Sequence, residues 1–137
     1  MPWHHQSAWS GSPEDVHSAR EFVVGCLTAH QLSRYEPAVS LVASELCTNA
    51  VVHARTPFTV SLERRDHLLV MEVRDGVVAP PASSTFVDPE ADGGRGLRLV
   101  EAFSSSWGVW RRMDGKSVWA TFTLRPGELP PGDVYGF

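Results

Sequence analysis

The stretch Glu45-Leu-Cys-Thr-Asn49-Ala-Val-Val-His53 decides the fold of this chain. Its three strongly polar residues are four positions apart, and four residues turn an α-helix by about 400°, so their side chains form one stripe along a predicted helix. The stripe borders the apolar face of the same helix, which consists of Val39, Val42, Leu46 and Ala50. A carboxylate, an amide and an imidazole at the margin of a core supply hydrogen-bond acceptors and donors to one pocket.

Two interpretations of this stripe are open. Asparagine has a low helix propensity, so the place of Asn49 in the middle of a helix indicates a bound partner. A surface pair of Glu45 and Asn49 beside a structural His53 would give the same spacing. The stripe alone therefore does not decide whether a site is present.

Helices are predicted on both sides of a short break at residues 31–34. Ser12 is a favoured N-cap residue, Pro13 suits the first helical position and two acids follow, so the first helix begins here and ends near residue 30. The second helix covers residues 37–54 and contains the polar stripe.

Alternating apolar residues predict the strands. An edge strand is expected within residues 1–11, a hairpin over 58–73, and a second pair of strands over 107–124. Asp114-Gly115 suits the tight turn of that second pair.

Residues 76–94 are rich in Pro, Gly and Ser and have no periodicity, which predicts a lid, and a third helix is expected from Gly96. The chain then reads strand, two helices, two strands, lid, helix, two strands. This order predicts an α+β fold, a two-layer α/β sandwich whose mixed sheet is covered on one face by helices.

The bulk properties fit one domain over residues 1–125 with a Pro/Gly-rich tail over 126–137. The formal net charge of −4 gives no electrostatic basis for binding nucleic acid or an anionic membrane. No apolar run is long enough to span a bilayer, and the N-terminal residues do not resemble a signal peptide, so a cytoplasmic location is expected. Cys26 and Cys47 lie in apolar helical contexts and are expected to be free thiols.

Two further elements carry chemistry only in combination with the stripe. Asp75-Gly76 ends an alternating strand, where a carboxylate can accept a hydrogen bond from the exocyclic amine of adenine. The segment Gly93-Gly94-Arg95-Gly96-Leu97 opens a helix, whose unpaired N–H groups and dipole favour a phosphate. Alone, these segments also fit a strand end and a hinge.

Together, the three elements resemble the GHKL ATPases, which have the Bergerat (histidine-kinase-like ATPase) fold with an ATP lid. Three strings are similar to the anti-sigma-factor serine/threonine kinases within that superfamily, over about residues 12–124. The strings are Ser44-Glu-Leu-Cys-Thr-Asn-Ala-Val-Val-His-Ala54, Gly94-Arg-Gly-Leu-Arg-Leu-Val-Glu101 and Gly115-Lys-Ser-Val-Trp-Ala120.

The resemblance implies roles for individual residues. Asn49 would hold Mg²⁺ against the phosphates of ATP, and Glu45 would be the general base that takes the proton of an attacking Ser or Thr hydroxyl. Asp75 would bind the adenine amine, with Gly76 leaving room for the ring and Ser117 placing a hydroxyl near the base. The phosphates would be held by Gly94, Arg95, Gly96 and Leu97.

The resemblance also implies partners and leaves alternatives open. A STAS-type anti-anti-sigma protein would be the phosphorylated substrate, a sigma factor would be sequestered, and the chain would form a homodimer. Members often have Asp-x-Gly-x-Gly, whereas Val77 and Ala79 occupy those glycine positions here. An ATP-responsive binding switch without efficient turnover, or an interaction domain with a decayed site, remains an alternative, and His53 has no assigned role.

Overall fold

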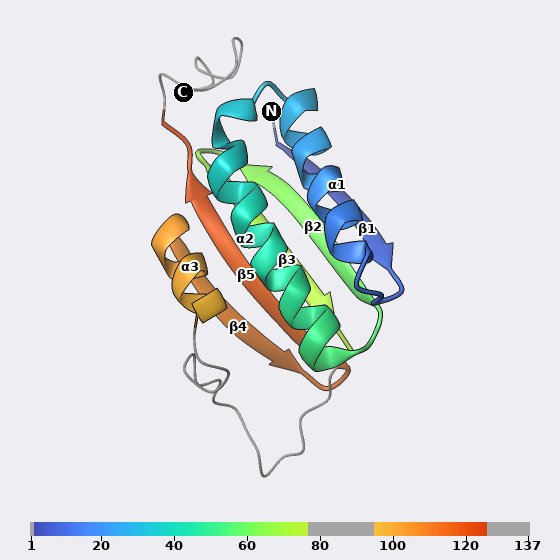
Figure 1. Ribbon diagram of the computed structural model, residues 1–137. Coiled ribbons are helices and arrows are strands. Elements are labelled where there is room, and N and C mark those ends of the chain that lie inside the picture. The colour runs from blue at the N-terminus through green and yellow to red at the C-terminus, as the bar shows by residue number, and fades with distance from the viewer. Residues whose placement is uncertain (1, 77–94, 126–137) are drawn as a thin grey trace.

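The structure, a computed structural model, describes residues 2–76 and 95–125. Their helices and strands follow the predicted order (Figure 1). In chain order they are β1 (Trp3–Trp9), α1 (Asp15–Ala29), the 3-10 turn η1 (Ser33–Tyr35), α2 (Glu36–Asn49), the π-helical segment η2 (Ala50–Ala54), β2 (Phe58–Arg65), β3 (Leu68–Asp75), α3 (Arg95–Phe103), β4 (Ser106–Arg112) and β5 (Gly115–Thr123). The expected lid, except Gly76, and the tail lie outside the described residues.

The strands form one five-stranded sheet in the order β1-β2-β3-β5-β4. The helices α1, α2 and α3 cover one face of this sheet and leave the other face open (Figure 1). The structure therefore confirms the predicted α+β two-layer sandwich, and it confirms that the first strand lies at an edge.

The prediction of a mixed sheet is wrong, because every neighbouring pair of strands is antiparallel. The strands β3 and β4 do run in the same direction, as expected for strands joined through a crossover helix. However, β5 lies between them and pairs with both, so the parallel strands are never neighbours. The order of strands across a sheet is a tertiary property that local alternation does not contain.

The core lies between the sheet and the helices. In β2 and β3 every second side chain is buried, and the apolar members of the two sets are at most 2% exposed: Phe58, Val60, Leu62, Leu69, Met71 and Val73. The predicted apolar face of the second helix is buried in the same way, at Val39, Val42 and Leu46 in α2 and at Ala50 in η2. The two periodicities of the sequence thus meet at one interface.

The two cysteines are free and buried, as expected. Burial raises the pKa of the Cys47 thiol to about 12 and also raises that of Cys26. Both thiols are therefore protonated at neutral pH and pack as small apolar side chains. Within the described ranges, no helix is both long enough and apolar enough to cross a membrane.

The predicted helix over 37–54 is present, but its last turn changes geometry. After α2 the chain continues as the π-helical segment Ala50–Ala54, and Arg55 adopts a left-handed conformation with a φ of 56° that ends it. Single π-helical turns within α-helices occur frequently at functional sites. Here the segment carries the last residue of the polar stripe, His53.

The start of α1 differs from the prediction of a Ser12 cap. Asp15, the first residue of the helix, folds back, and its Oδ2 accepts hydrogen bonds from the backbone N–H of Ser12 at 2.8 Å, that of Gly11 at 3.0 Å and the hydroxyl of Ser10 at 3.0 Å. The hydrogen bond from Ser12 is the largest of the effects that lower the pKa of Asp15 below 3.8. Since a carboxylate accepts hydrogen bonds more strongly than a hydroxyl, Asp15 organises this turn.

We predict that Asp15→Asn lowers the midpoint of thermal unfolding at pH 7 and that the deficit narrows on acidification. A lowered folded-state pKa contributes stability above the unfolded value of 3.8, and this contribution is lost as pH falls through the folded-state pKa. The measurement is a series of melts between pH 7 and pH 3. Glu14→Gln is the matched control, because its side chain makes no capping hydrogen bond. A deficit of the same size at every pH would refute the role of the charge.

Candidate functional site

The polar stripe begins on the margin of the helix layer. Glu45 and Asn49 are partly exposed on α2, whereas the intervening residues Leu46 and Cys47 are buried. His53, in η2, is exposed. The prediction that Glu45 and Asn49 flank the core face is confirmed, and their side chains are separated by one helical turn.

The carboxylate of Asp75 lies at the end of β3, directly beneath the helix layer. The residue is 5% exposed, and it shares the helix-covered face of the sheet with its cross-strand partners Phe58 and Lys116. The segment η2 contacts β3. This contact brings the C-terminal end of the stripe to the strand that carries Asp75.

Lys116 lies beside the candidate site residue Asp75, and the sequence analysis did not identify it. Its Nζ lies 3.6 Å from Oδ2 of Asp75, and the side chains of Lys116 and Asp75 are 18% and 3% exposed. The sequence contained the information needed to place Lys116. It is separated from the core residues Val118 and Ala120 by even numbers of positions along β5. Strict alternation places such a residue on the core side of the sheet.

Glycine allows β5 to approach β3 closely beside Asp75. Gly115 has a φ of +153°, and a Cβ at this position would lie 2.0 Å from the carbonyl oxygen of Asp75. No other residue fits without moving one strand. Gly115 therefore fixes the approach at which Lys116 meets Asp75.

A second contact holds the residue after Asp75. The backbone N–H of Gly76 donates to Oγ1 of Thr56 at 2.9 Å. Thr56 follows η2 and also packs closely against Gly11. A Cβ at Gly11, whose φ is +102°, would lie 2.5 Å from the carbonyl oxygen of Thr56. The chain that leaves the stripe is thus attached to the end of β3.

Ser117 does not join this group. It pairs with Arg74 in β3 and Trp110 in β4, so its side chain lies on the face of the sheet opposite Asp75. Ser117 is fully buried, and its Oγ has no hydrogen-bond partner within residues 2–76 and 95–125. The structure therefore does not bring the hydroxyl of Ser117 together with Asp75, and it places Lys116 beside this carboxylate instead.

The glycine-rich segment is described only in part. Gly93 and Gly94 lie outside the described residues, whereas Arg95, Gly96 and Leu97 form the first turn of α3. This helix packs beside α2 (Figure 1). Its residue Leu97 contacts the core. The predicted start of the third helix, Gly96, is one residue late.

A sequence model of the histidine kinase-like ATPase domain matches residues 9–122, most of the chain. The chain belongs to this family. Membership implies an ATP-binding domain. Comparison with curated proteins gives no match.

Among solved structures, this ATPase domain is similar to the RsbU and RsbW domains of Rv1364c from Mycobacterium tuberculosis. The TM-score is 0.65 at 17% sequence identity. The similarity covers 90% of this chain but 32% of the other, and at this identity it shows a shared fold.

The residues present fit a nucleotide with Mg²⁺. The amide oxygen of Asn49 is a hard ligand of the kind that Mg²⁺ accepts. Among the described residues, no group of three or more His, Cys, Asp or Glu could hold a metal ion. Mg²⁺ at nucleotide sites commonly takes most of its ligands from phosphate oxygens and water, so one amide oxygen is compatible with such a site.

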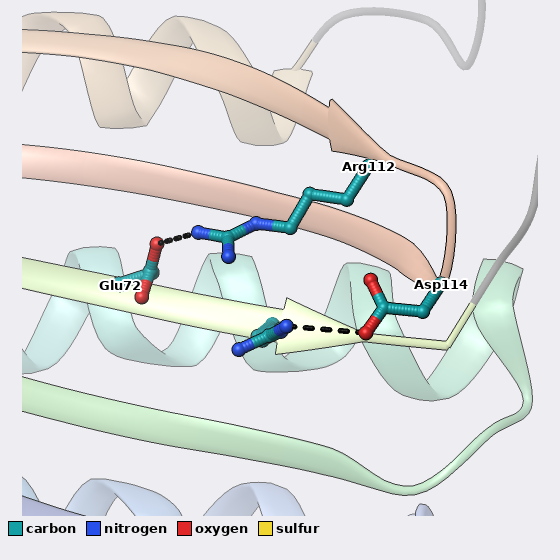
Figure 2. Close-up of polar contacts among 4 residues, drawn as sticks. Glu72, Arg112 and Asp114 are labelled. Carbon is teal, nitrogen blue, oxygen red and sulfur yellow. Dashed lines mark hydrogen bonds and ion pairs between the residues drawn. The ribbon is translucent and has the colours of Figure 1, made fainter.

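The face of the sheet that the helices leave open carries ion pairs and a concavity. Figure 2 shows the side chain of Arg112 reaching Glu72, and it shows Asp114 in the turn before β5. Arg112 donates a hydrogen bond to Glu72 at 3.4 Å, and Arg74 donates one to Asp114 at 3.3 Å. A concavity of about 760 Å³ lies on this face beside Trp119. It lies on the opposite side of the sheet from the Asp75 carboxylate, so it is not part of the candidate site.

We predict that Gly115→Ala lowers the free energy of unfolding by more than about 1 kcal/mol, because the added Cβ collides with the Asp75 carbonyl in a backbone conformation that alanine disfavours. Urea unfolding measures the change. The control is Gly25→Ala in α1, where a Cβ meets nothing within 4 Å. Replacing this helical glycine by alanine should raise the free energy of unfolding by about 0.5–1 kcal/mol. Equal effects of the two substitutions would contradict the close approach at Gly115.

Proposed function

We propose that this domain binds ATP with Mg²⁺ and transfers the γ-phosphoryl group to a Ser or Thr hydroxyl of a STAS-type anti-anti-sigma protein, and that it sequesters a sigma factor. The observation that carries the proposal is the pairing of two features. A carboxylate and an amide, Glu45 and Asn49, lie one turn apart on the accessible margin of α2. A buried carboxylate, Asp75, lies on the sheet face that the helices cover.

Glu45 is the proposed general base. Phosphoryl transfer requires positioning and charge neutralisation more than covalent chemistry, so the enzyme needs one group to orient the hydroxyl and accept its proton. A partly exposed glutamate can reach a protein substrate, which a buried one could not. Bound Mg²⁺ would supply the neutralisation of phosphate charge.

Asn49 and the start of α3 are the proposed phosphate end of the site. The amide oxygen of Asn49 would ligate Mg²⁺, one turn from the base. Gly94, Arg95, Gly96 and Leu97 would present backbone N–H groups to the phosphates, in keeping with the helix start observed at Arg95. Asp75 and Gly76 would form the adenine end.

We predict that Glu45→Ala reduces phosphoryl transfer at least about 100-fold, the usual contribution of a general base, and changes ATP affinity by less than about threefold. Transfer is measured with γ-labelled ATP and a STAS-domain substrate, and binding by calorimetry. Thr48→Ala is the control, because Thr48 is exposed on the same helix. Equal loss of transfer and binding would contradict the general-base role. If the wild type binds ATP tightly but transfers no phosphoryl group, the domain is an ATP-responsive switch and not a kinase.

We also propose that the open face of the sheet pairs two copies of the domain. Trp110 is 63% exposed there, and the guanidinium of Arg112 lies 5.4 Å from the centre of its ring. The face carries acids and bases side by side, as in the ion pair of Arg112 with Glu72. A twofold interface needs such a self-complementary surface.

We predict that Trp110→Glu converts a dimer to a monomer, because the added charge replaces an exposed aromatic side chain of the proposed interface. Light scattering after size-exclusion chromatography measures the mass. Met113→Glu, at a 95% exposed position in the β4–β5 turn, serves as the control and should remain dimeric. A wild-type protein that is monomeric at every concentration would refute the pairing.

A further inference from the structure

The ion pair of Asp75 with Lys116 places two groups of opposite hydrogen-bonding character at the proposed adenine site. Both side chains lie on the helix-covered face, at directly opposite positions of β3 and β5. The carboxylate is an acceptor only, and the ammonium group is a donor only. The sheet therefore presents an acceptor and a donor side by side at the end where the base is proposed to bind.

The separation of the pair leaves hydrogen-bonding capacity on Lys116. Its Nζ lies 3.6 Å from Oδ2 of Asp75, which is longer than the roughly 2.7–3.2 Å of an N–H···O hydrogen bond. The ammonium has three N–H groups in all. Its side chain is 18% exposed against 3% for Asp75, so the lysine is the more accessible member of the pair.

The Watson–Crick edge of adenine has the complementary pattern. Its exocyclic N6 amine is a donor, and the adjacent ring nitrogen N1 is an acceptor. We propose that Lys116 is a specificity-determining residue that donates a hydrogen bond to N1 of adenine while Asp75 accepts one from N6. This inference rests on the proposed function, because it requires ATP at this site.

A purely structural role for Lys116 makes a different prediction. If the ammonium only neutralises Asp75, its removal weakens the binding of every nucleotide that uses the carboxylate, by the same factor. If it donates to N1, its removal weakens only nucleotides that have an acceptor at this ring position. The analogue 1-deaza-ATP, in which a C–H replaces N1 and the N6 amine is kept, separates the two roles.

The experiment is calorimetric titration of the full chain with Mg–ATP and Mg–1-deaza-ATP. We expect the wild type to prefer ATP by about tenfold, the cost of one hydrogen bond to a charged donor. The Lys116→Met variant should bind the two nucleotides with equal affinity. The control is Arg74→Met, which removes an Arg–Asp ion pair at the same end of the sheet but on the opposite face, and it should keep the tenfold preference.

Three results overturn the proposal in different ways. If the wild type binds the two nucleotides with equal affinity, no group donates a hydrogen bond to N1. This measurement uses only the wild-type protein, so it does not depend on the folding of a variant. A preference for ATP that survives in Lys116→Met, with its far-UV circular dichroism unchanged, assigns the preference to another group. Absence of binding of either nucleotide to the wild type contradicts the proposed function itself.

Discussion

The pairing of β3 with β5 is the constraint on which the candidate site depends. Antiparallel register places Asp75 opposite Lys116, and the absence of a side chain at Gly115 allows the strands to approach there. Because successive side chains of a strand point to opposite faces, this register also turns Ser117 away from Asp75. A slip by one residue would exchange the two faces of β5 and remove Lys116 from the carboxylate.

The helix layer supplies the other half of the site. The buried face of α2 fixes the rotation of that helix, so Glu45 and Asn49 are held at its margin by the packing of Leu46 and Cys47. The hydrogen bond from Gly76 to Thr56 then links the chain after η2 to the end of β3. The sheet thus holds the adenine end of the proposed site and the helices hold its phosphate end.

The sequence predicted most of the fold because periodicity reports which face of an element is buried. The helices, the two hairpins and the edge strand follow from apolar spacing, and Asp75 was found at a strand end. The order of strands was not predictable in this way, and the mixed sheet was wrong because β5 inserts between β3 and β4.

Two residue-level expectations differ from the observed contacts, for different physical reasons. The family resemblance implies Ser117, but alternation along β5 places Ser117 opposite Arg74 and Lys116 opposite Asp75. The Ser12 cap was reasonable from composition, but it is the carboxylate of Asp15 that accepts hydrogen bonds in this turn, from the backbone N–H groups of Gly11 and Ser12. The structure gives the positions of Glu45 and Asn49 on α2, and their roles in phosphoryl transfer stay predictions.

The most direct test of the central claim, that ATP binds between α2 and the helix-covered face of the sheet, is a crystal structure with Mg²⁺ and a non-hydrolysable ATP analogue. The account predicts the adenine N6 within about 2.7–3.2 Å of an Asp75 carboxylate oxygen, with the phosphates beside Asn49. A base bound instead in the concavity beside Trp119, on the open face of the sheet, would contradict it.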